Sequence, residues 1–174
     1  MRHVAFLRAI NVGGHIVRME HLRKLFARMG FAGVETFIQS GNVFFDAKSG
    51  KTQTQEQVIE KALESALGYP VATFIRSLPE LQSIAATQPF DGAEGTLYIG
   101  FLKEAPSGSA CDSLLAIQTA NDALHIGSRE VYWHCRSKFK DATISGALIE
   151  KTLKMPATFR NVSTVRKMAA KVQT

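Results

Sequence analysis

The chain has 174 residues, of which 45% are hydrophobic and 21% charged, a composition that is ordinary for a folded globule and excludes a disordered chain. No apolar run approaches the roughly 20 residues that span a bilayer, and the first residues lack the apolar core and cleavage site of a secretory signal. We therefore expect a cytoplasmic protein without membrane association.

The net charge of +6 is concentrated at the two ends of the chain. Residues 1–30 carry a net charge of +5, and residues 151–174 carry +6 without any acidic residue. If the two ends lie close together, they form one basic surface suited to phosphates or carboxylates. The alternative is that both are solvated helix faces that bind no partner.

The first half of the sequence predicts the element order βαββαβ. A strand at residues 3–10 precedes a helix that starts near Met19 and ends at Gly30. Two strands follow, then a helix that starts at the capping-box pattern of residues 54–57, then a fourth strand. The strands are at residues 34–39, 43–45 and 71–76, and the helix ends at Leu67.

The second half repeats this order after a connecting helix that begins at residues 77–80 and ends near Thr87. Its expected elements are strands at 97–102, 123–126, 130–135 and 157–159, helices at 112–119 and 144–153, and a closing basic helix. We therefore predict an α+β protein of two tandem ferredoxin-like, βαββαβ-type halves with antiparallel sheets. The expected division is 1–88 for the first half with its connecting helix, 89–96 for a linker, and 97–174 for the second half. The first strand is apolar on both faces, so we expect the halves to pack together.

Three polar segments interrupt this pattern of apolar strands and plain helices. The first, residues 7–14, leaves the first strand with Arg8, Asn11, Gly13 and Gly14. Paired glycines let backbone N–H groups approach a ligand closely, although the spacing matches neither a P-loop nor a dinucleotide fingerprint. A glycine-rich strand exit with a purely structural role is the alternative.

The second and third segments lie at a turn and at a helix start. Gly41 and Asn42 suit the backbone of a hairpin turn, whereas the turn does not require Gln39 or Ser40. In the third segment, residues 158–164, we expect Asn161 to be the N-cap of the closing helix, with Arg160 beside it. A helix N-terminus next to a guanidinium forms a seat for an anion, unless the arginine pairs with a surface acid.

Neither cysteine shows CxxC or zinc-ligand spacing, so we predict no metal and no cofactor. His125, His134 and Cys135 offer metal-ligand atoms, but a packing thiol and histidines on a strand surface explain them more simply.

The motifs LRAINVGG, FIQSGNVFF and a late RNxxTV together resemble the DUF1697 family, bacterial proteins of undefined function, over essentially the whole chain. The resemblance implies a tandem ferredoxin-like arrangement and no particular reaction. Where the family usually has tryptophan after the late Arg-Asn, this chain has Val162. The resemblance places thirteen residues on recurrent positions of the family, and we predict that these residues bind the ligand: Arg8, Asn11, Gly13, Gly14, Gln39, Ser40, Gly41, Asn42, Ser137, Lys138, Arg160, Asn161 and Thr164.

These segments contribute no Asp, Glu, His or Cys, the groups that usually supply acid–base or nucleophilic catalysis. We therefore expect a protein that binds an anionic or nucleotide-like small ligand in a pocket between the halves. The alternatives are a phosphoryl- or nucleotidyl-type transferase or hydrolase that acts by positioning, and single-stranded RNA binding through a half that resembles an RNA-recognition module. The sequence leaves both the oligomeric state and any catalytic residue open.

Overall fold

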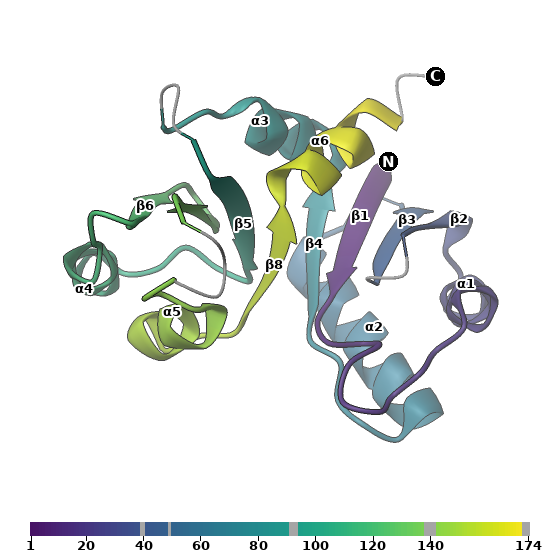
Figure 1. Ribbon diagram of the computed structural model, residues 1–174. Coiled ribbons are helices and arrows are strands. Elements are labelled where there is room, and N and C mark those ends of the chain that lie inside the picture. Colours follow the sequence, from purple (N-terminus) through teal and green to yellow (C-terminus); the bar gives the residue numbers. More distant parts are fainter. Residues whose placement is uncertain (39–40, 49, 91–93, 138–141, 172–174) are drawn as a thin grey trace. The chain divides into compact units, whose positions relative to one another are not determined.

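The computed structural model describes residues 1–38, 41–48, 50–90, 94–137 and 142–171, which form two compact units, Met1–Leu81 and Gln82–Thr174. Figure 1 shows the order of their elements along the chain. The linker predicted at residues 89–96 stays a prediction, and its last residue, Thr96, is the first residue of a strand. Among the described residues, no helix combines the length and the apolar character needed to cross a bilayer.

The first unit has the predicted βαββαβ order and one antiparallel sheet of four strands. Its strands lie in the spatial order β2-β3-β1-β4, which is the ferredoxin-like order. Helix α3 (Leu78–Ala86) begins in this unit and continues into the second. The other elements are β1 (Arg2–Leu7), α1 (Met19–Arg28), β2 (Ala32–Phe37), β3 (Asn42–Asp46), α2 (Thr52–Leu67) and β4 (Thr73–Ser77).

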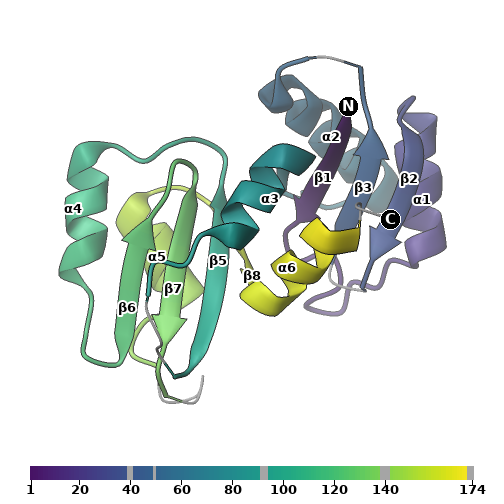
Figure 2. The ribbon, with the colours of Figure 1, turned by 90° about the horizontal axis from the view of Figure 1, so that it is seen from above.

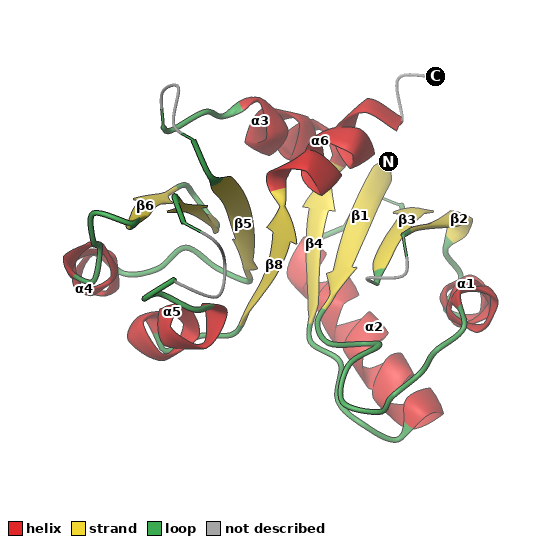
Figure 3. Ribbon diagram, in the orientation of Figure 1, coloured by secondary structure: helices red, strands yellow, loops and turns green. Residues whose placement is uncertain are grey.

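The second unit has the same topology, with its strands in the spatial order β6-β7-β5-β8. Figure 2 shows β6, β7 and β5 side by side, and Figure 3 shows α4 and α5 beside this sheet. The predicted α+β fold of two similar halves is therefore confirmed. The elements are β5 (Thr96–Leu102), α4 (Gly108–Ala116), β6 (Asp122–Ile126), β7 (Glu130–Cys135), α5 (Gly146–Leu153), β8 (Ala157–Asn161) and α6 (Val162–Lys171).

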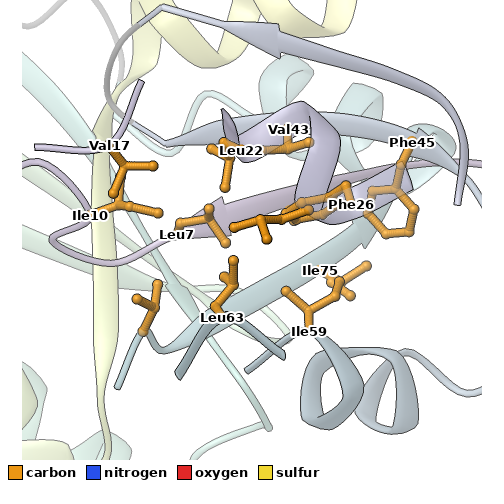
Figure 4. Packing of buried hydrophobic residues seen from close by; sticks show 13 residues of the cluster. Leu7, Ile10, Val17, Leu22, Phe26, Val43, Phe45, Ile59, Leu63 and Ile75 are labelled. Carbon is orange, nitrogen blue, oxygen red and sulfur yellow. The ribbon is translucent and has the colours of Figure 1, made fainter. Parts of the chain in front are cut away.

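The core of the first unit lies between its sheet and helices α1 and α2. Figure 4 shows Leu22 and Phe26 of α1 and Leu63 of α2 gathered around Leu7 of β1. These four side chains are fully buried. The 3.6-residue spacing of the apolar positions in α1 places them on one face, and burial of that face fixes the helix to the sheet.

The start of α2 differs from the sequence prediction. The helix begins at Thr52 rather than at the pattern of residues 54–57, and no side chain caps it. Glu56 is buried and accepts a hydrogen bond at 2.8 Å from the backbone N–H of Ile75 in β4. The backbone N–H groups of Thr54 and Gln55 donate to the carbonyl of Lys51 at 3.1 and 3.3 Å, so the helix already includes Thr54.

Candidate functional site

The first polar segment forms a loop at residues 8–18 between β1 and α1. Gly13 and Gly14 have φ angles of +69° and +86°, and a Cβ atom would meet nothing within 4 Å at either position. The two glycines are therefore required by the backbone path, and both are exposed. Asn11 accepts a hydrogen bond at 2.8 Å from the backbone N–H of Val17, which closes the loop.

Tyr69, which follows the C-terminal end of α2, contacts this loop at two positions. Its hydroxyl donates to the carbonyl of Ile10 at 3.3 Å, and the His15 ring stacks on it with centroids 3.8 Å apart. These two contacts join the loop to a residue 59 positions away from Ile10 in the sequence. They give the loop a fixed aromatic base.

A hollow of about 470 Å³ opens between the loop, α1 and α2, and we call it the N-terminal hollow. Its volume lies within the range of roughly 300–1,000 Å³ that is usual for small-molecule sites. The residues that line it are Gly14, His15, Ile16, Val17, Arg18, His21, Ala66, Leu67 and Tyr69. This set holds one guanidinium and two imidazoles but no carboxylate.

The N-terminus of α1 adds to the positive potential of the hollow. Arg18 stands at the N-cap position without a side-chain cap, and the first helical hydrogen bond runs from Leu22 to its carbonyl. The N–H groups of residues 19–21 therefore have no acceptor within the helix. The one acidic residue of this turn, Glu20, is paired with Lys24 at 2.7 Å, and this hydrogen bond lowers the pKa of Glu20.

The second polar segment has a structural role in the residues that the structure describes. Gly41 has a φ of +75°, and a Cβ there would lie 2.7 Å from the Ile10 side chain. Asn42 is fully buried and donates to the carbonyl of Phe37 at 3.0 Å. Gln39 and Ser40 lie outside the described residues.

The third polar segment confirms the predicted cap of α6. The side-chain oxygen of Asn161 accepts a hydrogen bond at 2.9 Å from the backbone N–H of Ser163. Arg160 is half-buried and donates to the hydroxyl of Thr158 at 2.8 Å and to the carbonyl of Phe159 at 2.9 Å. Burial lowers the pKa of Arg160 to about 10, so this guanidinium stays charged at neutral pH.

The remaining predicted site residues are distributed over both units. Thr164 is half-buried in α6, the carbonyl of Ser137 accepts from the Cys135 thiol at 3.4 Å, and Lys138 lies outside the described residues. The side chain of Arg8 is exposed, while its backbone N–H donates to the carbonyl of Ala72 at 2.9 Å. Binding of a ligand by Arg8 and Arg160 stays a prediction.

Of the predicted site residues, Gly14 lines the N-terminal hollow and Asn11 shapes its loop. Sequence reasoning missed the side chains that give the hollow its charge, His15, Arg18 and His21. These three residues follow one another at intervals of three positions across the loop and the helix start, and this spacing could have indicated that they lie together. The role of Tyr69 had no signal of this kind, because it depends on a contact between distant positions.

Comparison with known proteins supports the resemblance found in the motifs. The family model for a protein of unknown function, DUF1697, matches residues 1–132. The chain belongs to this family. The conserved bacterial protein SP0830 from Streptococcus pneumoniae has a similar structure, with a TM-score of 0.76 and 23% sequence identity. The similarity covers 99% of this chain and 98% of that protein, so the two proteins have the same fold. The sequence has no significant match among curated proteins.

Proposed function

We propose that this DUF1697 protein binds a small anionic ligand of nucleotide type in the N-terminal hollow. The observation that carries the proposal is Arg18, which lines the hollow at the uncapped N-terminus of α1. A helix N-terminus supplies free N–H groups and a partial positive charge, and a guanidinium adds charge-assisted hydrogen bonds. This combination suits a phosphate or carboxylate group.

The two sides of the hollow differ in chemistry, and the difference orients the ligand. Ala66 and Leu67 lie in the last turn of α2, where the helix dipole is negative and the side chains are apolar. An anionic group is therefore favoured beside Arg18 and His21, on the α1 side. The stacked rings of His15 and Tyr69 offer a flat surface for a planar, uncharged part of the same ligand.

The strand aromatics do not favour the alternative of RNA binding through β3. Phe44 and Phe45 are 1% and 0% exposed, so neither ring presents a face on which a base could stack. Both rings belong to the buried core. A ligand in the N-terminal hollow leaves this strand uninvolved.

The proposal is tested by titrating the ¹⁵N-labelled protein with inorganic phosphate, ribose 5-phosphate and adenosine monophosphate at low ionic strength. We expect saturable shifts of the amide signals of residues 14–21 and the tightest binding for adenosine monophosphate. Arg18→Gln should weaken all three interactions about tenfold or more, because a hydrogen bond to a charged group contributes roughly 1.5–3 kcal/mol.

The matched control is Arg28→Gln, which removes an exposed arginine from the opposite end of the same helix. Its affinities should stay within about twofold of the unmodified protein, since charge alone at that distance is screened. Equal effects of the two substitutions, or amide signals of residues 14–21 that do not respond to any of the three anions, would show that the proposal is wrong.

A further inference from the structure

A buried histidine of the second unit lacks hydrogen-bond partners. His134 lies in β7 opposite Leu97 of β5 and is 3% exposed, so its predicted place on a strand surface is wrong. Within the described part of the chain, neither Nδ1 nor Nε2 of its ring has a hydrogen-bond partner. A neutral imidazole offers one donor and one acceptor, and buried polar atoms are normally paired. The ring therefore calls for a partner that is not among the described residues.

His134 borders a pocket of about 200 Å³ that we call the His134 pocket. This volume has room for roughly six water molecules, at about 30 Å³ each, or for one small organic molecule. It is smaller than the usual sites of nucleotide-sized ligands. The described residues that line the pocket all belong to the second unit: Gln88, Phe90, Gly95, Leu97, His134, Val162 and Arg166.

The polar groups of the His134 pocket favour an anion. Arg166 of α6 is exposed, and its Nε atom makes a long hydrogen bond of 3.5 Å to the carbonyl of Ala85. A guanidinium has five N–H groups, so donors remain for a ligand. Among the lining residues that the structure describes, none is acidic, and Arg166 supplies a positive charge.

The apolar walls of the pocket narrow the choice of anion. The Phe90 ring stacks on His134 with centroids 5.4 Å apart, and Leu97 and Val162 complete an apolar lining. Inorganic phosphate would place its hydrated oxygens against these side chains, which is unfavourable. In the described segments, no three His, Cys, Asp or Glu side chains converge in a way that would hold a metal ion, so His134 does not belong to a metal-ligand cluster there.

We propose that the His134 pocket binds a small carboxylate that carries a short apolar stem. One carboxylate oxygen accepts a hydrogen bond from the N–H of His134, and the carboxylate pairs with the Arg166 guanidinium. The stem lies against Phe90, Leu97 and Val162. This inference concerns a different unit from the N-terminal hollow and does not depend on the function proposed there.

The experiment follows the imidazole signals of the full-length protein by NMR during titration with sodium butyrate. Butan-1-ol, butylammonium chloride and sodium phosphate at matched ionic strength serve as neutral, cationic and inorganic-anion controls. We expect a saturable shift of the His134 ring signals with butyrate, a weaker response to phosphate, and no saturable response to the other two. The amide signals of residues 14–21 report separately on the N-terminal hollow.

Two substitutions on neighbouring positions of α6 provide the matched comparison. Arg166→Gln should weaken butyrate binding at least tenfold, whereas Lys167→Gln, which changes an exposed lysine outside the pocket lining, should leave it within twofold. His134→Leu should abolish the butyrate-dependent shifts of the backbone amide signals of Leu97 and Val162, which line the same pocket. The inference is overturned if butyrate gives no saturable shift at His134, if butan-1-ol or phosphate binds as tightly, or if the two α6 substitutions have equal effects. The Arg166 result decides the question even if His134→Leu fails to fold.

Discussion

Asp122 shows how one carboxylate organises the core of the second unit. It is fully buried at the start of β6 and accepts hydrogen bonds from the Trp133 indole at 2.8 Å and the Asn121 amide at 3.1 Å. Thr143 donates to it twice, from its backbone N–H at 3.0 Å and its hydroxyl at 2.9 Å. Burial alone would raise the pKa of Asp122, but these hydrogen bonds outweigh it and hold the pKa below 3.8.

We predict that Asp122→Asn lowers the free energy of unfolding at pH 7 by roughly 2–3 kcal/mol, because the amide turns donors toward groups that need an acceptor. Since the folded pKa lies below the unfolded value, the stability from Asp122 is present above about pH 3.8 and is lost as the pH falls through the folded pKa. The difference between the two proteins should therefore shrink in acid. Urea unfolding, followed by the fluorescence of the single tryptophan, Trp133, measures this difference at each pH.

The control for this prediction is Asp112→Asn, which alters an exposed aspartate on α4. It should change the free energy of unfolding by less than about 0.5 kcal/mol. A gap between Asp122→Asn and the unmodified protein that stays constant from pH 7 to pH 3 would contradict the proposed titration of Asp122.

At the scale of elements, two identical sequence patterns have different outcomes. Residues 54–57 and 77–80 each have Ser or Thr followed three positions later by Glu or Gln, the signature of a capping box. At Ser77 the box forms: Glu80 accepts from the Ser77 N–H at 2.7 Å and from its hydroxyl at 2.8 Å, and the Glu80 N–H donates back at 3.4 Å. At Thr54 it does not, because the helix already includes that residue.

We predict that Ser77→Ala lowers the free energy of unfolding by about 1 kcal/mol through loss of the reciprocal cap of α3. Thr54→Ala is the matched control, since it removes a hydroxyl at the same pattern position without removing a cap. It should change stability by less than about 0.5 kcal/mol. Both values come from urea unfolding curves with a common slope, and equal losses for the two variants would refute a cap-specific effect.

Capping contacts also decide where the other helices begin. The order of strands and helices could be predicted from the periodicity of apolar residues, but several helix starts could not. The helix predicted at 112–119 is α4, Gly108–Ala116, whose N-cap Ser107 accepts from the Ala110 N–H at 3.2 Å. The helix predicted from residue 144 begins at Gly146, because Ser145 is its N-cap and accepts from the Leu148 N–H at 3.1 Å, while Ile144 is buried in the core before the helix starts. A buried apolar residue next to a helix satisfies the helical period without belonging to it.

The candidate site was predictable to the extent that local backbone chemistry defines it. Gly13, Gly14 and Asn11 were identified because their types suit a positive φ or a loop hydrogen bond. Tyr69 was not, because its position beneath the loop results from folding of the whole unit. The buried His134 was assigned to a strand surface, because period-two alternation does not reveal which face of a strand is covered.

At the scale of the whole molecule, the two units repeat one design despite dissimilar sequences. In each unit the last strand lies at an edge of the sheet, and a glutamate from the preceding helix accepts a backbone N–H of that strand. Glu60 of α2 accepts from Thr73 at 2.8 Å, and Glu150 of α5 accepts from Ala157 at 2.8 Å. When Val4 of β1 is aligned with Ile99 of β5, the pairing of β1 with β4 and of β5 with β8 places Thr73 and Ala157 at equivalent positions. Such contacts satisfy the N–H groups that an edge strand leaves unpaired.

The first unit has a second contact of this type that the second unit replaces by packing. Glu56 accepts from the N–H of Ile75, but the position four residues before Glu150 is Gly146. A Cβ on Gly146 would lie 3.1 Å from the Phe159 ring, which also closely approaches Gly100. The aromatic ring thus occupies the space that a longer side chain fills in the first unit.

We predict that Glu60→Ala and Glu150→Ala have equivalent local effects, because each exposes one edge N–H to solvent. Hydrogen exchange should lose protection at Thr73 in the first variant and at Ala157 in the second, with a loss of about 1–2 kcal/mol in the free energy of unfolding for each. Glu64→Ala and Lys151→Ala, at exposed positions of the same two helices, are the controls and should leave both amides protected. Unchanged protection at Ala157 in Glu150→Ala would mean that the repeated contact stabilises only the first unit. Equal loss in both variants would instead show that two unrelated sequences satisfy the same edge strand by the same chemistry, which is how a tandem fold persists while its residues diverge.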